Sequence, residues 1–281
     1  MTSPIVGRRL LAADLRRHRL ESGRTIEEVA AHLECSPAKV SRMETGIVKV
    51  GPQDLRAVLE LYGVDGAARD TLFDLVRQAR VRGWWEAYAD VVPPGSARFY
   101  GLEDGAELIA QHVTSLVPGL LQTEGYIRAL VGSVAGIDPA IVDRRVELRL
   151  RRATLLDRPE PPELDVLLDE AVLRRVIGGQ EVFAEQLRHL LAVADRPSVS
   201  LRMIEFDAPV HPAVGITFTL FRFAGDPTGV VFREQLDANA FLDDPDAVAG
   251  YHASLTAAAA VAAGPDRSRE LLAARLAEVD Q

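Results

Sequence analysis

The stretch Arg24–Gly46, RTIEEVAAHLECSPAKVSRMETG, decides the fold of the N-terminal part of the chain. Thr25 is a good helix N-cap, and Glu28 follows three positions later, which is the spacing of a capping box. Apolar residues then recur at the spacing of one helical face, at Ile26, Val29, Ala30 and Leu33. The first half of the stretch therefore predicts a short amphipathic helix.

A second helix start follows after the short turn Glu34–Cys35. Ser36 is a second N-cap, and Pro37 stands at the first helical position, where its missing N–H breaks no hydrogen bond. Gly46 ends this second helix. Two short helices joined by a tight turn are typical of a helix-turn-helix motif.

The same periodicity predicts three further helices around this pair. A first helix carries Leu11 and Leu15 and stops at Gly23, and a fifth begins at or near Asp65. The inward positions of the fourth and fifth helices are Leu55, Val58, Leu59 and Tyr62, and Leu72, Leu75, Val76 and Ala79. Five short helices predict a helix-turn-helix domain over residues 1–83.

In the helix that begins at Pro37, small or polar side chains lie on the outer face when Val40 and Met43 point inward. They are Ala38, Lys39, Ser41 and Arg42. A helix that enters the DNA major groove must expose side chains of this kind near its N-terminus. Arg42 can pair with guanine through two hydrogen bonds, Lys39 can reach a base or a phosphate, and Ala38 can touch a thymine methyl group.

Three more residues are candidates for contacts to the DNA backbone. Thr25 and Ser36 place hydroxyl groups at helix N-termini, where phosphates bind, and Lys49 lies in the following loop. The alternative interpretation is a five-helix bundle with an ordinary solvated polar face. The agreement between the exposed polar positions and the capping positions favours DNA binding.

The stretch resembles the XRE, or lambda-repressor-like, helix-turn-helix of transcriptional regulators. Two departures stand out. The family often has Gln at the first position of its second helix, where this chain has Ile26, so that phosphate contact is not carried over. The family commonly has Gly followed by an apolar residue in the tight turn, where this chain has Glu34–Cys35.

Charge is divided unevenly along the chain. The 281 residues carry a formal net charge of −9, yet residues 1–83 contain 14 basic and 11 acidic residues, and residues 84–281 contain 18 basic and 30 acidic residues. The mildly basic N-terminal part permits phosphate binding. The acidic remainder would repel DNA and limit non-specific binding of the whole protein.

Other bulk properties exclude several classes of protein. One cysteine, Cys35, leaves no disulfide framework, and the N-terminus lacks a signal-peptide h-region. The most apolar run, Ala253–Gly264, is shorter than the roughly 20 residues of a membrane span. We therefore expect a cytoplasmic protein without membrane contact, associated with the nucleoid when bound to DNA.

A change in composition marks the expected domain boundary near residue 83. The segment 84–103 contains both tryptophans, Trp84 and Trp85, together with Tyr88 and few helix signals. Its aromatic residues could form a stacking platform for a ligand or base. The favoured interpretation is a linker whose aromatic cluster docks against the second domain, residues 104–281.

The remainder alternates helix and strand patterns and predicts an α+β domain with a small sheet covered by helices. Expected strands are Leu164–Leu168 and the runs SVSLRMIEF, ITFTLFRF and GVVFREQL. The run ITFTLFRF alternates at Ile216, Phe218, Leu220 and Phe221/Phe223, as in a half-buried strand. Helices are expected from about Thr123, after Asp138 and over residues 179–197, and two final helices are expected to open with an Asp cap.

The most basic run of the chain lies in the helix after Asp138. Its arginines are Arg144, Arg145, Arg149, Arg151 and Arg152. They could form a nucleic-acid patch, but the acidic neighbours Asp143, Glu147 and Asp157 favour a surface helix with ion pairs.

No pattern in the sequence predicts catalysis. The six histidines lack metal-ligand spacing, and a Gly-rich phosphate loop and a nucleophile elbow are both absent from the sequence. Asp169–Glu170 with Arg174–Arg175, and Glu234, could be polar groups of a pocket, although surface ion pairs are the favoured interpretation. We expect no enzyme, and no catalytic, cofactor-binding or metal-binding residue.

The second domain is also similar to a known one. The motifs GWWEAY, VPGLLQTEGY, LDEAVLRR, GGQEVFAEQLRHLLAVAD and FREQL…AFLDDPDAVAGY follow, in order, the domain of unknown function that accompanies XRE helix-turn-helices in actinomycete regulators. The resemblance implies a transcriptional regulator. Since one recognition helix reads too few base pairs for useful specificity, we further expect a homodimer on a palindromic operator in double-stranded DNA. The second domain would dimerise and respond to a partner or a small-molecule effector. The alternative is an antitoxin-like interaction module that binds a small neighbour-encoded protein and only regulates its own operon.

Overall fold

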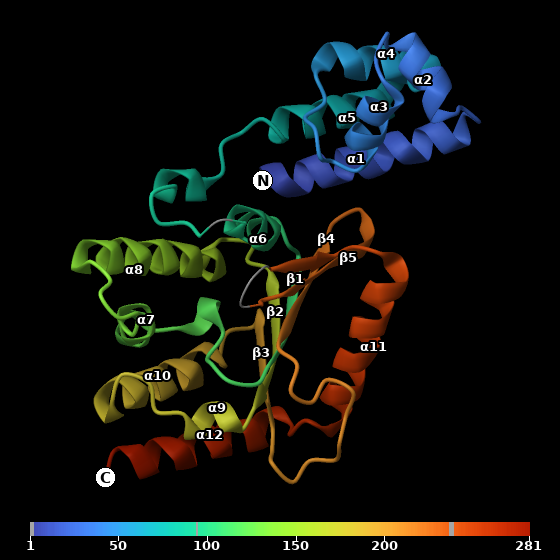
Figure 1. Cartoon of the computed structure of the whole chain (residues 1–281). Helices are drawn as coiled ribbons and strands as arrows, with labels where there is room; N and C mark the ends of the chain where they lie inside the picture. Colours follow the sequence, from blue (N-terminus) through green and yellow to red (C-terminus); the bar gives the residue numbers. More distant parts are fainter. Residues whose placement is uncertain (1–2, 94, 236–238) are drawn as a thin grey trace. The chain divides into compact units, whose positions relative to one another are not determined.

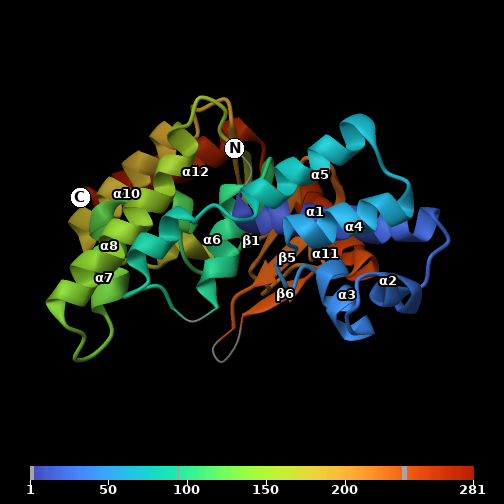
Figure 2. The ribbon, with the colours of Figure 1, turned by 90° about the horizontal axis from the view of Figure 1, so that it is seen from above.

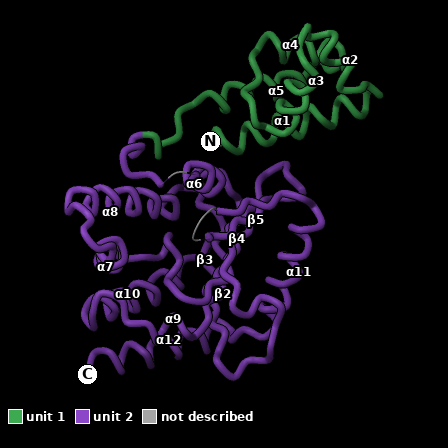
Figure 3. The backbone as a smooth tube through the Cα atoms, viewed as in Figure 1, with its two compact units in different colours: residues 1–86 green, residues 87–281 purple. Residues whose placement is uncertain are grey.

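The computed structural model describes residues 3–93, 95–235 and 239–281 of the chain. The chain divides into two compact units, residues 1–86 and residues 87–281, which Figure 3 distinguishes by colour. Each unit has its own hydrophobic core.

The described part of the first unit contains five α-helices, as the apolar periodicity predicts (Figure 1). They are α1 (Pro4–Glu21), α2 (Ile26–His32), α3 (Pro37–Glu44), α4 (Pro52–Tyr62) and α5 (Gly66–Gln78), and the 3-10 helix η1 (Trp84–Tyr88) follows. Helix α1 carries Leu11 and Leu15 as predicted and begins at Pro4, because Ser3 caps it and Pro4 occupies its first position. Gly23, just beyond its end, has a positive φ of 67°, as a helix-stopping glycine should.

One apolar cluster holds these five helices together. Every predicted inward position of the fourth and fifth helices contributes to it except Ala79, which is also buried. The fully buried members of the cluster include Leu11, Val29, Leu55, Leu59 and Leu72. Apolar side chains of this size each stabilise the fold by roughly 1.5–3 kcal/mol when fully buried.

The second unit is built on a six-stranded mixed sheet in the order β3-β2-β1-β4-β5-β6. The strands are β1 (Leu108–Val113), β2 (Glu163–Asp169), β3 (Val199–Ile204), β4 (Phe218–Phe223), β5 (Asp226–Arg233) and β6 (Ala240–Leu242). Strands β1, β2 and β3 run parallel, whereas β1 pairs with β4, β4 with β5 and β5 with β6 in antiparallel fashion.

Helices cover both faces of this sheet (Figures 1 and 2). They are α6 (Ser96–Asp104), α7 (Glu124–Gly132), α8 (Pro139–Ala153), α9 (Ala171–Arg174), α10 (Gln180–Val193), α11 (Pro245–Val261) and α12 (Pro265–Val279), with the 3-10 turns η2 (Gly119–Leu121) and η3 (Thr154–Asp157). On one face Phe99 of α6 packs against Phe221, with ring centroids 5.6 Å apart. On the other face Val248 and Leu255 of α11 join the cluster that contains Leu220.

The edge strand β3 is closed by the start of α12. The backbone N–H of Met203 donates to Ser268 Oγ at 2.9 Å, and the Met203 carbonyl accepts from the Ala263 N–H at 2.8 Å. Satisfying these groups within the chain protects the edge from pairing with another strand.

The predicted α+β class of the second unit is confirmed, with some local differences. The alternation expected along β4 is wrong, because Phe218, Thr219, Leu220 and Phe221 are all buried in a strand with helices on both faces, and Ile216 lies exposed before it. Helix α11 has the predicted Asp244 cap, but α12 is capped by Gly264 instead of Asp266. Helix α6, with Gly95 at its N-cap, and the short strand β6 were not expected.

Candidate nucleic-acid interface

Helix α2 begins with the capping box that the sequence predicts. The Thr25 hydroxyl accepts from the Glu28 N–H at 3.1 Å, and the Glu28 carboxylate accepts from the Thr25 N–H at 2.9 Å. That hydrogen bond lowers the pKa of Glu28. Glu27 and Glu28 place two negative charges in the first turn, so the helix terminus beside Thr25 is a poor partner for a phosphate.

The turn between α2 and α3 is closed by backbone hydrogen bonds. The Cys35 N–H donates to the Ala30 carbonyl at 2.9 Å, and Glu34 takes a left-handed conformation with φ of 50°. Among the non-glycine residues that the structure describes, Glu34 alone has a positive φ. This is the position where the helix-turn-helix resemblance leads one to expect glycine, so the chain forms the tight turn at the expense of backbone strain.

Helix α3 presents the face predicted from its sequence. Val40 and Met43 are buried in the core, whereas Ala38, Ser41 and Arg42 are exposed. The Ser36 hydroxyl accepts from the Lys39 N–H at 3.2 Å, and the first turn contains no acidic residue. Unlike the N-terminus of α2, that of α3 is therefore electrostatically suited to an anionic partner.

Lys39 differs from the other residues of this face because it has an intramolecular partner. Its ammonium group lies 2.9 Å from the Asp54 carboxylate of α4, and this hydrogen bond raises the pKa of Lys39. The Lys39 side chain is 38% exposed. A DNA contact by Lys39 would therefore have to compete with Asp54.

Arg42 and Lys49 are exposed at the C-terminal side of α3. Among the described residues, no carboxylate forms an ion pair with either of them. The Arg42 carbonyl accepts from the N–H groups of Ile47 and Val48, at 2.9 Å and 3.2 Å, which fixes the start of the loop that carries Lys49. Both cationic side chains are therefore available to a DNA partner, and these hydrogen bonds hold the backbone at the start of the loop in place.

A buried ion pair fixes the position of α3 in the domain. Arg19 Nε and Nη2 of α1 donate to the two carboxylate oxygens of Glu44, at 2.7 Å and 2.9 Å, and Nη1 donates to the Arg24 carbonyl at 2.9 Å. One guanidinium thereby joins α1, the last residue of α3 and the segment before α2. Burial and the Glu44 carboxylate also raise the pKa of neighbouring Tyr62 to about 12.

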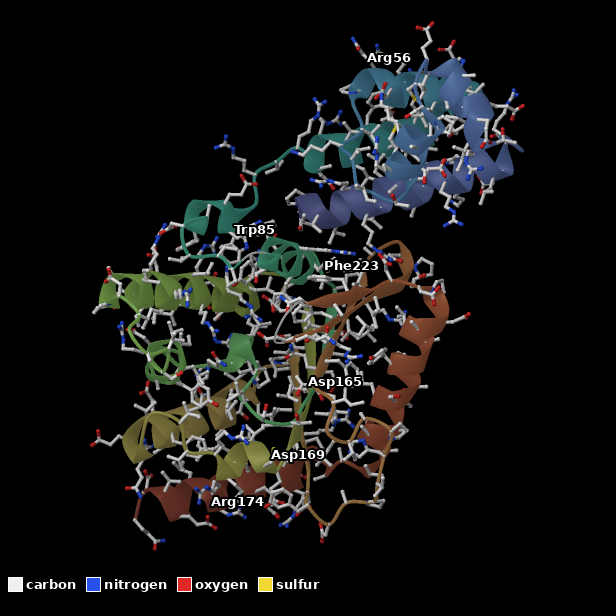
Figure 4. All side chains as sticks on the ribbon, in the orientation of Figure 1. Arg56, Trp85, Asp165, Asp169, Arg174 and Phe223 are labelled. Atoms are coloured by element: carbon white, nitrogen blue, oxygen red, sulfur yellow. The ribbon has the colours of Figure 1, made fainter. Side chains whose placement is uncertain are left out.

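Sequence patterns did not indicate this pair, because its partners lie 25 positions apart and belong to different helices. Sequence patterns also missed the start of α4 as a part of this surface. The Lys39–Asp54 ion pair connects it to α3. Gln53 and Arg56 of α4 are exposed, and Arg56 extends away from the body of the helix in Figure 4. They are polar side chains beside the predicted interface.

In the second unit, two of the residues considered for a pocket, Glu170 and Arg174, form ion pairs. The Glu170 carboxylate lies 3.1 Å from the Arg174 guanidinium, which also approaches Glu278 at 3.3 Å. Asp169 accepts from the Ala171 N–H at 2.8 Å (Asp169 and Arg174 are labelled in Figure 4). For Glu170 and Arg174 these contacts agree with the interpretation as surface ion pairs, whereas Asp169 has a backbone partner instead.

Two histidines far apart in the sequence meet in the second unit. His112 of β1 and His211 are both buried, with ring centroids 5.3 Å apart. His112 Nδ1 lies 2.7 Å from the Ile216 carbonyl and must therefore carry the proton. No group of three or more metal-ligand side chains occurs among the residues that the structure describes.

Comparison with known proteins assigns both units to families. Residues 10–72 match the family described as a helix-turn-helix domain, and residues 96–274, more than half of the chain, match a domain of unknown function, DUF5753. No curated protein and no solved structure matches the chain. The first unit is thus a helix-turn-helix domain, a domain type that binds DNA.

The apolar helices of the second unit were also compared with the requirements of a membrane span. In the described parts of the chain no single helix is long and apolar enough to cross a membrane, whereas α11 and α12, bent by 73°, meet the criterion only as a pair.

Proposed function

The chain belongs to the family that contains the domain of unknown function DUF5753, here preceded by a helix-turn-helix domain, and we propose that it is a sequence-specific transcriptional regulator of the XRE type. The observation that carries the proposal is that α3 has one face buried in the core and another face exposed to solvent. Val40 and Met43 anchor the helix in the core, and the Arg42 side chain is exposed without an ion-pair partner among the described residues.

The DNA contacts follow from this arrangement. Arg42, Ser41 and Ala38 face the bases, while the α3 N-terminus at Ser36 and the Lys49 ammonium contact phosphates. Lys39 exchanges its Asp54 partner for DNA. The contribution of Thr25 is the weakest, because its hydroxyl caps α2 beside Glu27 and Glu28.

A homodimer is the second part of the proposal. One helix of this kind contacts only a few base pairs, so two half-sites are needed for useful specificity. We assign dimerisation and the response to a partner or effector to residues 87–281, whose acidic composition disfavours a direct role on DNA.

Selection of bound sites from random double-stranded DNA with the full chain tests this function. The expected result is a motif with two related half-sites whose centres lie about 10 base pairs, or a multiple of that, apart. Failure to enrich any sequence would contradict the proposal. It would favour the alternative of an antitoxin-like interaction module, for which co-purification with a small protein is the corresponding measurement.

A further inference from the structure

The basic run of helix α8 contains a row of three arginines on one face. Arg145, Arg149 and Arg152 stand at positions i, i+4 and i+7, which place side chains above one another along a helix. Arg145 and Arg152 both act as like charges on Arg149, which lies between them in the row. Three arginine side chains therefore follow one another along one face of α8.

One of the three is fully compensated. Arg152 Nε and Nη2 donate to the two oxygens of the buried Glu103 carboxylate of α6, the second at 2.6 Å. Its guanidinium also lies over the Phe99 ring, 4.8 Å from the centroid. Gly119 makes room for it, since a Cβ there would lie 2.5 Å from Arg152 Nη1. Arg152 is thus a structural part of the packing between α6 and α8.

Arg149 has no comparable partner among the residues that the structure describes. Its Nη1 donates to the neutral Gln122 Oε1 at 3.1 Å, and Gln122 is itself fixed because its Nε2 donates to the Val117 carbonyl at 2.7 Å. The Arg149 side chain is half-buried. Burial, followed by the like charges of Arg152 and Arg145, lowers the pKa of Arg149.

Arg145 adds a second incompletely paired guanidinium one turn away. It is half-buried, and its Nε is buried without a hydrogen-bond partner among the described residues. A buried donor of this kind costs roughly 1–3 kcal/mol when nothing accepts from it.

The other charges that the structure describes near the row do not neutralise it. Glu234, after β5, favours the charged form of Arg149 but forms no ion pair with it among the described residues. The neighbouring arginine Arg144 is paired elsewhere, with Glu147 at 2.8 Å and Asp90 at 3.4 Å. Among the described residues, positive charge thus remains in excess at the half-buried Arg145 and Arg149, and Arg149 contacts the Gln122 amide, which is held in place by Val117.

We propose that Arg149 and Arg145, with Gln122, bind the oxyanion of a small molecule that carries a phosphate or carboxylate group. The forked donors of guanidinium match such oxyanions, and an anion would supply the acceptors that the row lacks. The ligand is a small molecule instead of DNA, because the two guanidiniums are half-buried in the strongly acidic part of the chain. This inference rests on the proposed function, because it names the chemical class of the effector to which the second unit would respond.

Calorimetry with the full chain tests the site, with inorganic phosphate and succinate as separate probes and sodium chloride at matched ionic strength as the reference. We expect saturable heat with at least one probe, which also identifies the preferred oxyanion. Arg149→Gln should weaken that binding at least tenfold, and Arg145→Gln should weaken it measurably. The matched control is Arg151→Gln, which removes the same charge from the exposed side of α8 and should leave binding unchanged. Absence of binding by both probes, or an equal loss in Arg151→Gln, would overturn the inference.

Thermal unfolding separates a binding role from a structural one. Without phosphate, Arg149→Met should raise Tm by about 1 °C or more, because it removes a desolvated like charge, and a bound probe should no longer raise it. A fall in Tm for Arg149→Met, with phosphate stabilising the variant as it does the wild type, would mean that Arg149 is structural. Loss of anion binding leaves DNA selection by the first unit intact, so failure of this inference and failure of the proposed function are distinguishable.

Discussion

Arg19 and Glu44 form a two-pronged ion pair between α1 and the end of α3, with N–O distances of 2.7 Å and 2.9 Å. Both side chains are nearly buried, with exposed fractions of 10% and 6%. The pair holds the helix that we assign to DNA reading against the rest of the domain, and its charges are not available to a ligand.

Arg19→Met should lower the free energy of unfolding of the first unit by roughly 3 kcal/mol, because it leaves the Glu44 carboxylate buried and unpaired. Arg19→Met combined with Glu44→Leu should recover much of the loss. Arg17→Met, which removes an exposed arginine paired with Asp14 and Glu21, should change stability by only about 0.5 kcal/mol. Urea unfolding of the three variants measures these differences. Similar losses in Arg17→Met and Arg19→Met would contradict the role of the buried pair.

Asp54→Asn should strengthen DNA binding to all sequences, because it removes the partner that holds Lys39 and one negative charge at the interface. Once Lys39 contacts phosphate, the slope of log affinity against log salt should steepen by about 0.9. Asp70→Asn provides the control, since it makes the same charge change at an exposed position of α5. Identical salt slopes for both variants would show that Lys39 does not bind phosphate when released.

Glu34→Gly should raise the free energy of unfolding by roughly 0.5–1 kcal/mol, because glycine adopts the left-handed conformation of this turn without strain. The same substitution at Glu27, inside α2, should instead cost about 1 kcal/mol of helix stability. Denaturant titration of both variants gives the comparison. Destabilisation by Glu34→Gly would mean that the Glu34 side chain contributes more than its backbone strain removes.

Stability of the second unit should fall as the pH drops below about 6.5, the ordinary pKa of histidine. Burial lowers the pKa of His112, with a further contribution from His211, while the Ile216 carbonyl and Asp169 act in the opposite direction. A folded-state pKa below the unfolded value means that the unfolded chain binds more protons in this pH range, so protons favour unfolding. The stability that the neutral form of His112 contributes is lost completely at pH values below its lowered folded-state pKa.

Urea midpoints between pH 7 and pH 5 measure this dependence. His112→Asn keeps a donor toward the Ile216 carbonyl but does not titrate, and it should therefore flatten the curve. Parallel curves for the wild type and His112→Asn would exclude His112 as the source.

Local signals account for what the sequence predicted well. Capping by Thr25 and Ser36, and burial of Val40 and Met43, depend on neighbours within one helical turn, and the structure contains each of them. The α+β class of the second unit likewise follows from short periodic segments.

Contacts between distant segments account for what sequence patterns missed. Arg19 finds Glu44, Lys39 finds Asp54, and Arg152 finds Glu103, each through packing of different helices. Strand β4 looked half-buried, since its periodicity does not show that helices cover both faces of the sheet. Sequence patterns also missed the environment of Arg149. They place it in an ordinary charged helix and do not show that packing half-buries its side chain.

The binding of Arg42→Ala to the selected DNA site is the measurement that tests the central claim most directly. Compared with wild type, it should bind the best site more weakly by roughly 1–3 kcal/mol and lose preference at one base pair, with little change on unrelated DNA. Lys49→Ala, by contrast, should weaken binding to all sequences alike. If Arg42→Ala bound the best site as tightly and selectively as wild type, the exposed face of α3 would not be the part of the protein that recognises DNA.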